Sequence, residues 1–317
     1  ASEFTAKQQR EFIVKDNVGF GEWDWDLIAN EWDAEQLDDW GLDLPVDFNV
    51  VEEAAEEDDY VEPDNLKVDV VLGDLIEIGE HRLLCGDSTD ETLVTKLLNG
   101  KKVDMLYTDP PYGVSVVGNL KEGKGGIGGA NPITFKGSIG KGVICKEGSY
   151  KPIIGDDKDF DPRFLLSYSD NLFIWGANYF SDLLPIGQWV VWDKNRPEGT
   201  TFSDCELAWT NGKGIAVKKY KCTWNGMTRE GESGKRVHPT QKPIKVCTEI
   251  IQDFSNENDI IMDLFLGGGS TMVASHPINR ITYGMELDPY YCQVIIDRMQ
   301  KLDENIKVKI NGKEYGE

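Results

Sequence analysis

The stretch that decides the fold is Asp259-Ile-Ile-Met-Asp263-Leu-Phe265-Leu-Gly267-Gly-Gly269-Ser-Thr271. Its apolar first half is typical of a buried β-strand, and the glycines predict a tight turn that opens a helix and lets the backbone approach a ligand. Fifteen residues after Thr271, Glu286 ends the next apolar segment, where a carboxylate can accept both hydroxyls of a ribose. The pattern favours a nucleoside-binding turn over a phosphate loop, because no Lys-Ser or Lys-Thr pair follows the glycines. A loosely packed turn without a ligand is the alternative.

Strand and helix patterns alternate through the rest of the chain. Strands are expected at residues 82–87, 103–108, 171–175, 188–192, 206–210 and 281–286, and helices at 89–98, 162–169, 238–254 and 289–302. This alternation predicts an α/β fold with a mostly parallel, doubly wound sheet. Ligands of such sheets bind at the carboxyl ends of the strands.

The tetrapeptide Asp109-Pro110-Pro111-Tyr112 follows the apolar segment 103–108. An amine attached to an aromatic base is a poor nucleophile, because its lone pair is delocalised into the ring. A carboxylate and a carbonyl that each accept one N–H pull the nitrogen toward tetrahedral geometry, and Asp109 and Pro110 can supply them. The prolines fix φ and remove competing donors, while Tyr112 offers a ring on which an extruded base can stack. Taken alone, the tetrapeptide is equally compatible with a plain Asp-Pro turn.

Four motifs, taken in their order along the chain, resemble those of the amino-methyltransferase family of DNA methyltransferases. Besides the tetrapeptide and the glycine turn, residues 84–88 resemble the short motif before the catalytic strand, and residues 238–243 the segment that leads into the cofactor helix. The catalytic motif precedes the cofactor motif, as in the circularly permuted beta class. The similarity covers residues 66–304 and implies a Rossmann-like methyltransferase fold. Departures are Leu264, where the family often has Pro, and Gly268-Gly269-Ser270, where Ser-Gly-Thr is commoner.

The resemblance implies S-adenosylmethionine as cofactor and a role for each matching residue. Asp109 and the Pro110 carbonyl would bind the target amine, and Tyr112 would stack on the base. Pro111 completes the predicted catalytic tetrapeptide. Asp87 would contact the cofactor adenine. The other predicted cofactor-binding residues are Ser88, Thr240, Lys242, Pro243, Asp263, Phe265, Gly267, Gly269, Ser270, Thr271 and, at the ribose, Glu286.

The net charge of −23 is unevenly distributed. Residues 1–65 hold 21 Asp and Glu against 3 Lys and Arg, whereas residues 211–245 hold nine Lys and Arg against two Glu. Because salt screens charges beyond about 8–10 Å, an acidic chain can still offer a basic groove. We interpret residues 211–237 as a candidate target-recognition element, although such runs are more often solvated faces. Its predicted DNA-binding residues are Lys218, Lys219, Lys221, Arg229, Lys235 and Arg236.

Three further features of the sequence each allow more than one interpretation. Residues 113–151 contain eleven glycines and predict a mobile loop that closes over an extruded base, follows the DNA backbone, or is an insertion without a role. Trp224 and Met227 could wedge into a duplex, but ordinary packing is favoured. Residues 1–65 predict an acidic, Trp-rich helical extension and linker. Their Glu-Trp-Asp repeats resemble the tail of ParB-like domains that precede methylases in phage and mobile elements, which implies a longer protein; a helical interaction segment is the alternative.

The sequence thus predicts that residues 66–317 flip a base out of DNA and methylate N6 of adenine, since Asp at position 109 leans toward adenine in this family. Methylation of cytosine N4 is the rival, and a non-catalytic DNA-binding or partition module with a degenerate methylase domain is the alternative from another class. The intact Asp109 and Glu286 argue against decay. The six cysteines and three histidines lack metal-site spacing, and the sequence contains no membrane-span pattern or secretory leader. We expect a DNA partner, a cytoplasmic protein of bacterial, phage or mobile-element origin, and either a monomer or a homodimer.

Overall fold

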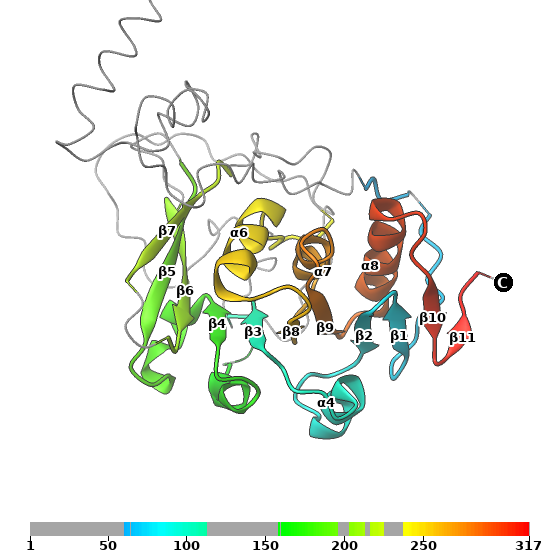
Figure 1. Cartoon of the computed structure of the whole chain (residues 1–317), viewed down its shortest axis with the longest axis horizontal. Helices are drawn as coiled ribbons and strands as arrows, with labels where there is room; N and C mark the ends of the chain where they lie inside the picture. Colours follow the sequence, from blue (N-terminus) through cyan, green and yellow to red (C-terminus); the bar gives the residue numbers. More distant parts are fainter. Residues whose placement is uncertain are drawn as a thin grey trace, which may run out of the picture. The chain divides into compact units, whose positions relative to one another are not determined.

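The computed structural model describes residues 60–63, 65–112, 158, 160–195, 203–212, 216–224 and 237–316. All of them belong to the larger of the two units into which the chain divides, residues 54–317. They form an 11-stranded sheet in the order β11-β10-β1-β2-β9-β8-β3-β4-β6-β5-β7 (Figure 1). The strands are β1 Leu75–Ile78, β2 His81–Cys85, β3 Met105–Thr108, β4 Leu172–Trp175, β5 Gln188–Asp193, β6 Cys205–Thr210, β7 Lys218–Lys221, β8 Ile260–Asp263, β9 Ile281–Glu286, β10 Val308–Ile310 and β11 Lys313–Glu314.

Parallel pairs form the centre of the sheet and also join β5 to β7 at one edge, but the other pairs are antiparallel, and this corrects the expectation of a mostly parallel sheet. Neighbouring strands run parallel from β2 through β9, β8 and β3 to β4. The flanking pairs of β1 with β2 and with β10, and of β6 with β4 and with β5, are antiparallel. The sheet is therefore mixed. The predicted central strands are correct, and the difference lies in flanking strands that the helix-strand alternation could not orient.

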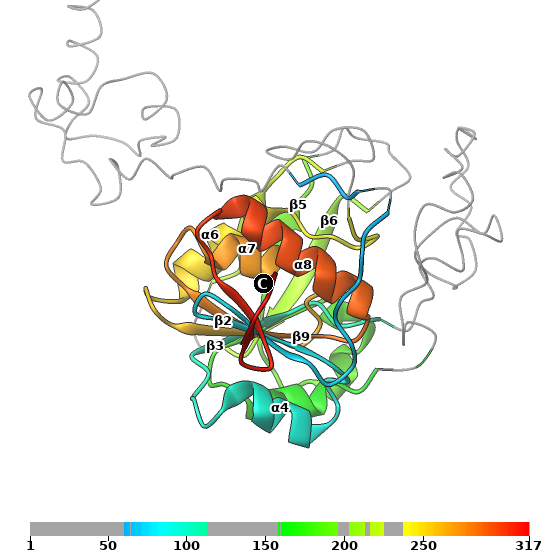
Figure 2. The same cartoon turned by 90° about the vertical axis from the view of Figure 1, so that its right-hand side faces the viewer.

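Helices cover both faces of this sheet. Helices α6 Ile244–Phe254, α7 Ser270–Ser275 and α8 Pro289–Leu302 pack on one face, and α4 Glu91–Leu98 lies on the other (Figure 2). Alternate side chains of β3 enter two different cores: Met105 and Tyr107 pack in the core that includes α6, α7 and α8, whereas Leu106 packs in the core that includes α4. Burial on both faces explains why the central strands are apolar at nearly every position. No helix in the described part of the chain is long and apolar enough to cross a bilayer.

The predicted helices and strands are largely confirmed, with differences at the ends and edges. Helix α4 begins after Asp90, whose carboxylate accepts hydrogen bonds from the backbone N–H groups of Thr92 and Leu93. The predicted helix at 162–169 is instead a 3₁₀ helix, Pro162–Ser167. Strands β1, β7, β10 and β11 were not predicted, because short segments such as Lys-Lys-Tyr-Lys of β7 owe their conformation to pairing rather than to an apolar pattern.

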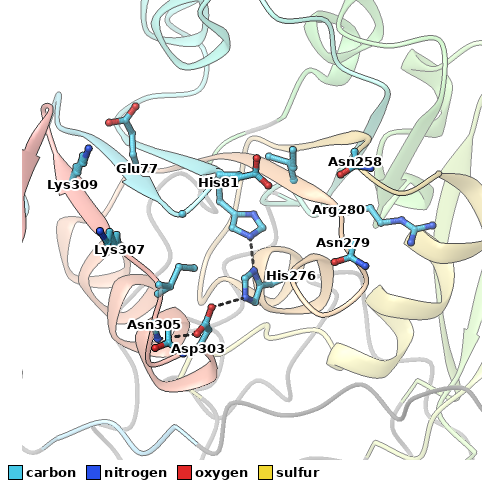
Figure 3. A pocket seen from close by; sticks show the side chains of 14 residues that line it. Glu77, His81, Asn258, His276, Asn279, Arg280, Asp303, Asn305, Lys307 and Lys309 are labelled. Carbon is cyan, nitrogen blue, oxygen red and sulfur yellow. Dashed lines mark hydrogen bonds and ion pairs between the residues drawn. The ribbon is translucent and has the colours of Figure 1, made fainter.

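A hollow of about 640 Å³ lies where the chain enters β2, β8 and β9, at the rim opposite their carboxyl ends (Figure 3). At its floor the backbone N–H of Thr282 donates to Nδ1 of His81 (2.9 Å), so the His81 proton lies on Nε2, which is 3.1 Å from Nδ1 of His276. His276 Nε2 in turn lies 3.5 Å from a carboxylate oxygen of Asp303. Both ring nitrogens of the buried His81 therefore have hydrogen-bond partners within the protein.

This histidine predicts an acid-sensitive fold. Burial, and then the neighbouring His276, lower the pKa of His81 from 6.5 to about 3. The unfolded chain therefore binds a proton that the folded chain excludes, and the free energy of unfolding falls as the pH drops from about 6.5 toward 3. In His81→Gln this dependence should be weaker by about 1.4 kcal/mol per pH unit, as measured by urea unfolding across that range.

The comparison of slopes isolates His81 from other groups that titrate in the same window. His238, whose pKa burial lowers to about 4, contributes with the same sign. Asp263 and Glu286, whose pKa values burial raises, contribute with the opposite sign. All three remain in His81→Gln, so equal slopes for the two proteins would contradict the prediction.

Candidate functional site

The two predicted motifs lie side by side at the carboxyl ends of adjacent parallel strands. Asp109 follows β3, and the glycine turn follows β8, its neighbour in the sheet. The Thr108 hydroxyl donates a hydrogen bond of 2.7 Å to Asp263, so the residue before the tetrapeptide is bonded to the residue before the turn. Glu286 ends β9, the next strand. The tetrapeptide, the turn and the predicted ribose carboxylate therefore share one rim of one sheet.

Asp109 uses both of its carboxylate oxygens. Lys242 donates to Oδ2 at 2.5 Å, and the Tyr112 hydroxyl donates to Oδ1 in a short hydrogen bond. Lys242 lies in the segment before α6, 133 residues after Asp109 in the chain, and its ammonium bonds to the tetrapeptide. Lys242, predicted among the cofactor residues, thus lies against the tetrapeptide.

Lys242 is also one link in a chain of alternating charges that the sequence analysis did not identify. Its ammonium lies 3.2 Å from Glu206, and the other carboxylate oxygen of Glu206 lies 2.6 Å from Lys194. Glu206 is near the start of β6, and Lys194 follows β5. Because β5 runs parallel to β4 and β6 antiparallel to both, these ends meet at the rim that carries Asp109. The only signal in the sequence was a charged residue at the end of each of two apolar strands.

Burial and pairing set opposite pKa shifts within this cluster. Burial raises the pKa of Asp109 and outweighs the lowering by Lys242. Burial alone would raise the pKa of Glu206, but Lys242 and Lys194 outweigh it and lower that pKa to about 2. Burial alone would lower the pKa of Lys242, and Asp109 and Glu206 raise it well above its usual value. The cluster therefore holds Lys242 as an ammonium and Glu206 as a carboxylate ion at neutral pH.

The Tyr112 ring is held in a narrow slot. It stacks on Tyr179 with centroids 5.1 Å apart and an interplanar angle of 18°. Its other neighbour is Gly176, directly after β4, whose φ is +64° and whose position leaves no room for a Cβ beside the ring. Neither Gly176 nor Tyr179 was predicted, because their role depends on the neighbouring loop.

The glycine turn is organised from within. Asp263 accepts hydrogen bonds from the hydroxyls of Thr108 (2.7 Å) and Thr271 (2.6 Å) and from the backbone N–H of Phe265 (3.0 Å). Burial raises its pKa to about 6. Gly269, with φ +88°, lies where a Cβ would meet Ile295 of α8. Here glycine is required both by the left-handed backbone and by the close approach of α8.

Glu286 bonds directly to this turn. Its Oε2 accepts from the backbone N–H of Gly267 at 2.8 Å, and its Oε1 accepts from that of Asp288 at 2.8 Å. Burial is the largest cause that raises its pKa, to about 7. Each carboxylate oxygen has a second lone-pair direction, so the carboxylate can accept further hydrogen bonds from a ligand.

The other predicted cofactor residues surround these elements. Ser270 and Thr271 begin α7, and Pro243 caps the start of α6. Thr240 bonds to Nδ1 of His238, a ring that lies 3.4 Å from a Cβ position at Gly267. Ser88 is buried after β2, whereas Asp87 is exposed and accepts from Thr89. No group of three or more potential metal ligands occurs among the described residues.

The predicted DNA-binding residues lie only partly within the described chain. Lys218, Lys219 and Lys221 are on the exposed edge strand β7, where Lys218 pairs with Asp253 (2.9 Å) and Lys219 with Asp193 (3.2 Å). Arg229, Lys235 and Arg236 lie outside the described residues, as do Met227 and residues 113–151. Trp224 is buried with its ring centroid 6.2 Å from that of Trp192, which is the packing role favoured for it.

Comparison with known protein families finds a match within this site. Residues 174–297 match the DNA methylase family. The matched DNA methylase region runs from β4 into α8 and includes Glu206, Lys242, the glycine turn and Glu286. The tetrapeptide at 109–112 precedes it, so the assignment of that motif rests on its position beside the matched region. The family comprises N6 and N4 methylases, so the match does not distinguish adenine from cytosine.

Individual methylases show the same similarity. The chain is 24% identical over 249 residues to the type II methyltransferase M2.LlaDCHI of Lactococcus lactis subsp. cremoris, a match that covers 67% of this chain and 87% of that protein. Among solved structures, M1.HpyAVI in complex with SAM is 21% identical, with 68% of this chain and 98% of that chain covered and a TM-score of 0.39. The cytosine-N4-specific PvuII DNA methyltransferase is 12% identical, with 71% and 93% covered and a TM-score of 0.42.

Proposed function

We propose that this chain is a DNA methyltransferase that transfers a methyl group from S-adenosylmethionine to an exocyclic base amine, N6 of adenine. The observation that carries the proposal is the hydrogen bond between Thr108 and Asp263, which joins the tetrapeptide to the glycine turn. An amine held by Asp109 and a methyl donor held at the turn would then be neighbours. The match to DNA methylases over residues 174–297 supports the reaction class.

The residues at the turn fit the proposed cofactor. Glu286 is a half-buried carboxylate whose oxygens can accept hydrogen bonds from ribose hydroxyls, and the left-handed Gly267 and Gly269 keep side chains away from the turn. When bound, S-adenosylmethionine supplies an electrophilic methyl group on a sulfonium. Asp263 stabilises the turn by accepting hydrogen bonds from Thr108, Thr271 and Phe265.

The tetrapeptide would prepare the amine. Asp109 accepts one N–H and the Pro110 carbonyl accepts the other, so the nitrogen lone pair leaves the ring system and points at the methyl carbon. This lone pair would form the new N–C bond with the methyl group that the cofactor supplies, and the electrons of the broken C–S bond would stay on sulfur. The nitrogen then releases one proton, and we assign the Asp109 carboxylate as its acceptor. Tyr112 stacks on the extruded base.

Adenine is preferred over cytosine because Asp, rather than Ser, stands at position 109 in a family with both activities. Cytosine N4 needs the same amine geometry and remains the second candidate. We further propose that Lys218, Lys219, Lys221, Arg229, Lys235 and Arg236 contact DNA, that residues 113–151 border the flipped base, and that residues 1–65 form a separate extension. The circular permutation, the ParB-like origin, the cytoplasmic location and a homodimer also stay predictions.

Product analysis tests the function. Duplex DNA, single strands and RNA are incubated with the full chain and S-adenosylmethionine labelled in its methyl group, and then digested to nucleosides. N6-methyladenine supports the proposal, and N4-methylcytosine selects the second candidate. If no substrate is labelled while S-adenosylmethionine still binds, the chain is the non-catalytic module instead.

Glu286 predicts how cofactor affinity depends on pH. Its pKa of about 7 in the free protein places a proton on the carboxylate that ribose hydroxyls would need as acceptor. Binding therefore favours the ionised form and releases a proton. Affinity for S-adenosylmethionine should rise about tenfold per pH unit below 7 and level off above it, as measured by calorimetry in buffers of different ionisation enthalpy.

The matched variant for this experiment is Glu286→Gln, which keeps the shape and loses the titrating proton. Its affinity should be about 10- to 100-fold lower at pH 8, the usual effect of losing hydrogen bonds to a charged group, with a flat profile between pH 5 and 8. Asp263 also titrates in this range, with a pKa of about 6, and is retained in the variant. An unchanged pH dependence in Glu286→Gln would assign the proton to Asp263 and not to Glu286.

A further inference from the structure

The Glu206 carboxylate is linked to Asp109 through the Lys242 ammonium, which lies 3.2 Å from Glu206 and 2.5 Å from Asp109. We propose that Glu206 is a positioning residue for the reaction: it shares the Lys242 ammonium with Asp109 and so sets how firmly that ammonium occupies the carboxylate that must receive the target amine. Lys194, on the far side of Glu206, tunes this sharing. The inference rests on the proposed function for its meaning in catalysis, but its electrostatic part is testable in the protein alone.

The first step is that Asp109 is occupied before any base arrives. Lys242 donates to one of its oxygens at 2.5 Å, and Tyr112 donates to the other. An incoming amine needs an acceptor in the same place. It can enter only if the Lys242 bond lengthens or makes room, so the strength of that bond enters the cost of placing the amine.

The second step is that Glu206 offers Lys242 a second carboxylate. Lys242 is buried, with 8% of its side chain exposed, so an ammonium released from Asp109 without another partner would be costly. Glu206 at 3.2 Å already shares it and can keep it paired. The rings of Trp175 and Tyr112, 5.4 and 6.0 Å from Nζ, border the same space and limit where the ammonium can move.

The third step concerns Lys194. It lies 2.6 Å from Glu206, is buried itself, and has Nζ 5.0 Å from the Trp192 ring centroid. The four groups form the order Lys194, Glu206, Lys242, Asp109, with alternating charge. Removing Lys194 leaves Glu206 free to attract Lys242 away from Asp109, whereas removing the charge of Glu206 leaves Lys242 to Asp109 alone. The two changes act on Asp109 with opposite signs.

These signs can be read from the ionisation of Asp109. Glu206→Gln removes a negative neighbour and concentrates Lys242 on Asp109, so the pKa of Asp109 falls. Lys194→Met exposes Asp109 to an unbalanced Glu206, so that pKa rises. Each shift is expected to be about half a unit or more. The titratable groups that face this cluster from the surrounding elements are Tyr107, Tyr112, Tyr179, His238 and Asp263, and none of them is changed.

The experiment measures this ionisation in two ways on the full chain. The first follows the carboxyl carbon of Asp109 by NMR in protein labelled with ¹³C-aspartate, with Asp109→Asn to identify its signal. The second follows the acidic limb of the kcat profile on DNA. Glu206→Gln should move both to lower pH and reduce kcat about tenfold, with the affinity for S-adenosylmethionine within twofold. Lys194→Met should move both to higher pH, and Glu206→Asp should restore part of the lost kcat.

Glu249→Gln is the matched control, since Glu249 pairs along α6 with Lys245 at 3.7 Å. It should leave the pKa of Asp109 and kcat unchanged. Shifts of the same sign in Glu206→Gln and Lys194→Met, or none in either, would overturn the inference. Opposite NMR shifts in a chain that transfers no methyl group would uphold the shared ammonium and reject the methyltransferase function, so the two failures are distinguishable.

Discussion

Replacing Asp109 with asparagine is expected to lower kcat for methyl transfer by about a thousandfold or more, a loss typical for a positioned charged group at a reacting centre. The amide keeps the size of the carboxylate but carries an NH₂ group where an acceptor is needed. The NH₂ group of the asparagine would then face either Lys242 or Tyr112, both of which donate hydrogen bonds, so two donors would meet. The amine nitrogen would lose the acceptor that frees its lone pair.

The same substitution should leave cofactor binding largely intact, because Asp109 makes no contact with Glu286 or with the glycine turn among its described hydrogen bonds. The measurement is kcat under saturating DNA and S-adenosylmethionine, with a separate titration of cofactor affinity. Asp170→Asn is the control, since its carboxylate is fully exposed and pairs only loosely with Lys102 at 4.0 Å. Normal turnover in Asp109→Asn would refute the assigned role.

The second large effect is expected from Gly176→Ala. A Cβ at this position would overlap the Tyr112 ring, so the ring must leave its stack on Tyr179. Because the Tyr112 hydroxyl also donates to Asp109, its movement disturbs both the base platform and the carboxylate. A displacement on the order of 1 Å at a reacting centre costs about a hundredfold in rate, and kcat should fall by that amount.

The control for this variant is Gly100→Ala. Gly100 also has a positive φ, +75°, but a Cβ there meets nothing within 4 Å. Both variants carry the strain of a left-handed alanine, about 1–2 kcal/mol, and Gly176→Ala adds the displacement of the Tyr112 ring. Only Gly176→Ala should lose activity, and equal activities of the two variants would show that the Tyr112 slot is not needed.

What the sequence could predict follows from local chemistry. The strand before Asp263, the glycine turn and the position of Glu286 at the end of β9 all appear at the predicted residues. They are predictable because a buried strand must be apolar and because a left-handed turn needs glycine, here with φ +53° at Gly267 and +88° at Gly269. The flanking antiparallel strands were not predictable in this way, since pairing rather than composition makes them strands.

The sequence by itself determined the candidate reactive groups of this protein. These are the Asp-Pro-Pro-Tyr carboxylate and ring after β3, the glycine turn after β8 and the Glu286 carboxylate at the end of β9. Only the tertiary structure decided which charged side chains form ion pairs with one another. Lys194, Glu206 and Lys242 come from three separate segments, and the sheet order brings their side chains to Asp109. The physical reason is that a strand's own residues fix its burial and its turn, whereas a buried charge is tolerated only through partners that the folded sheet supplies.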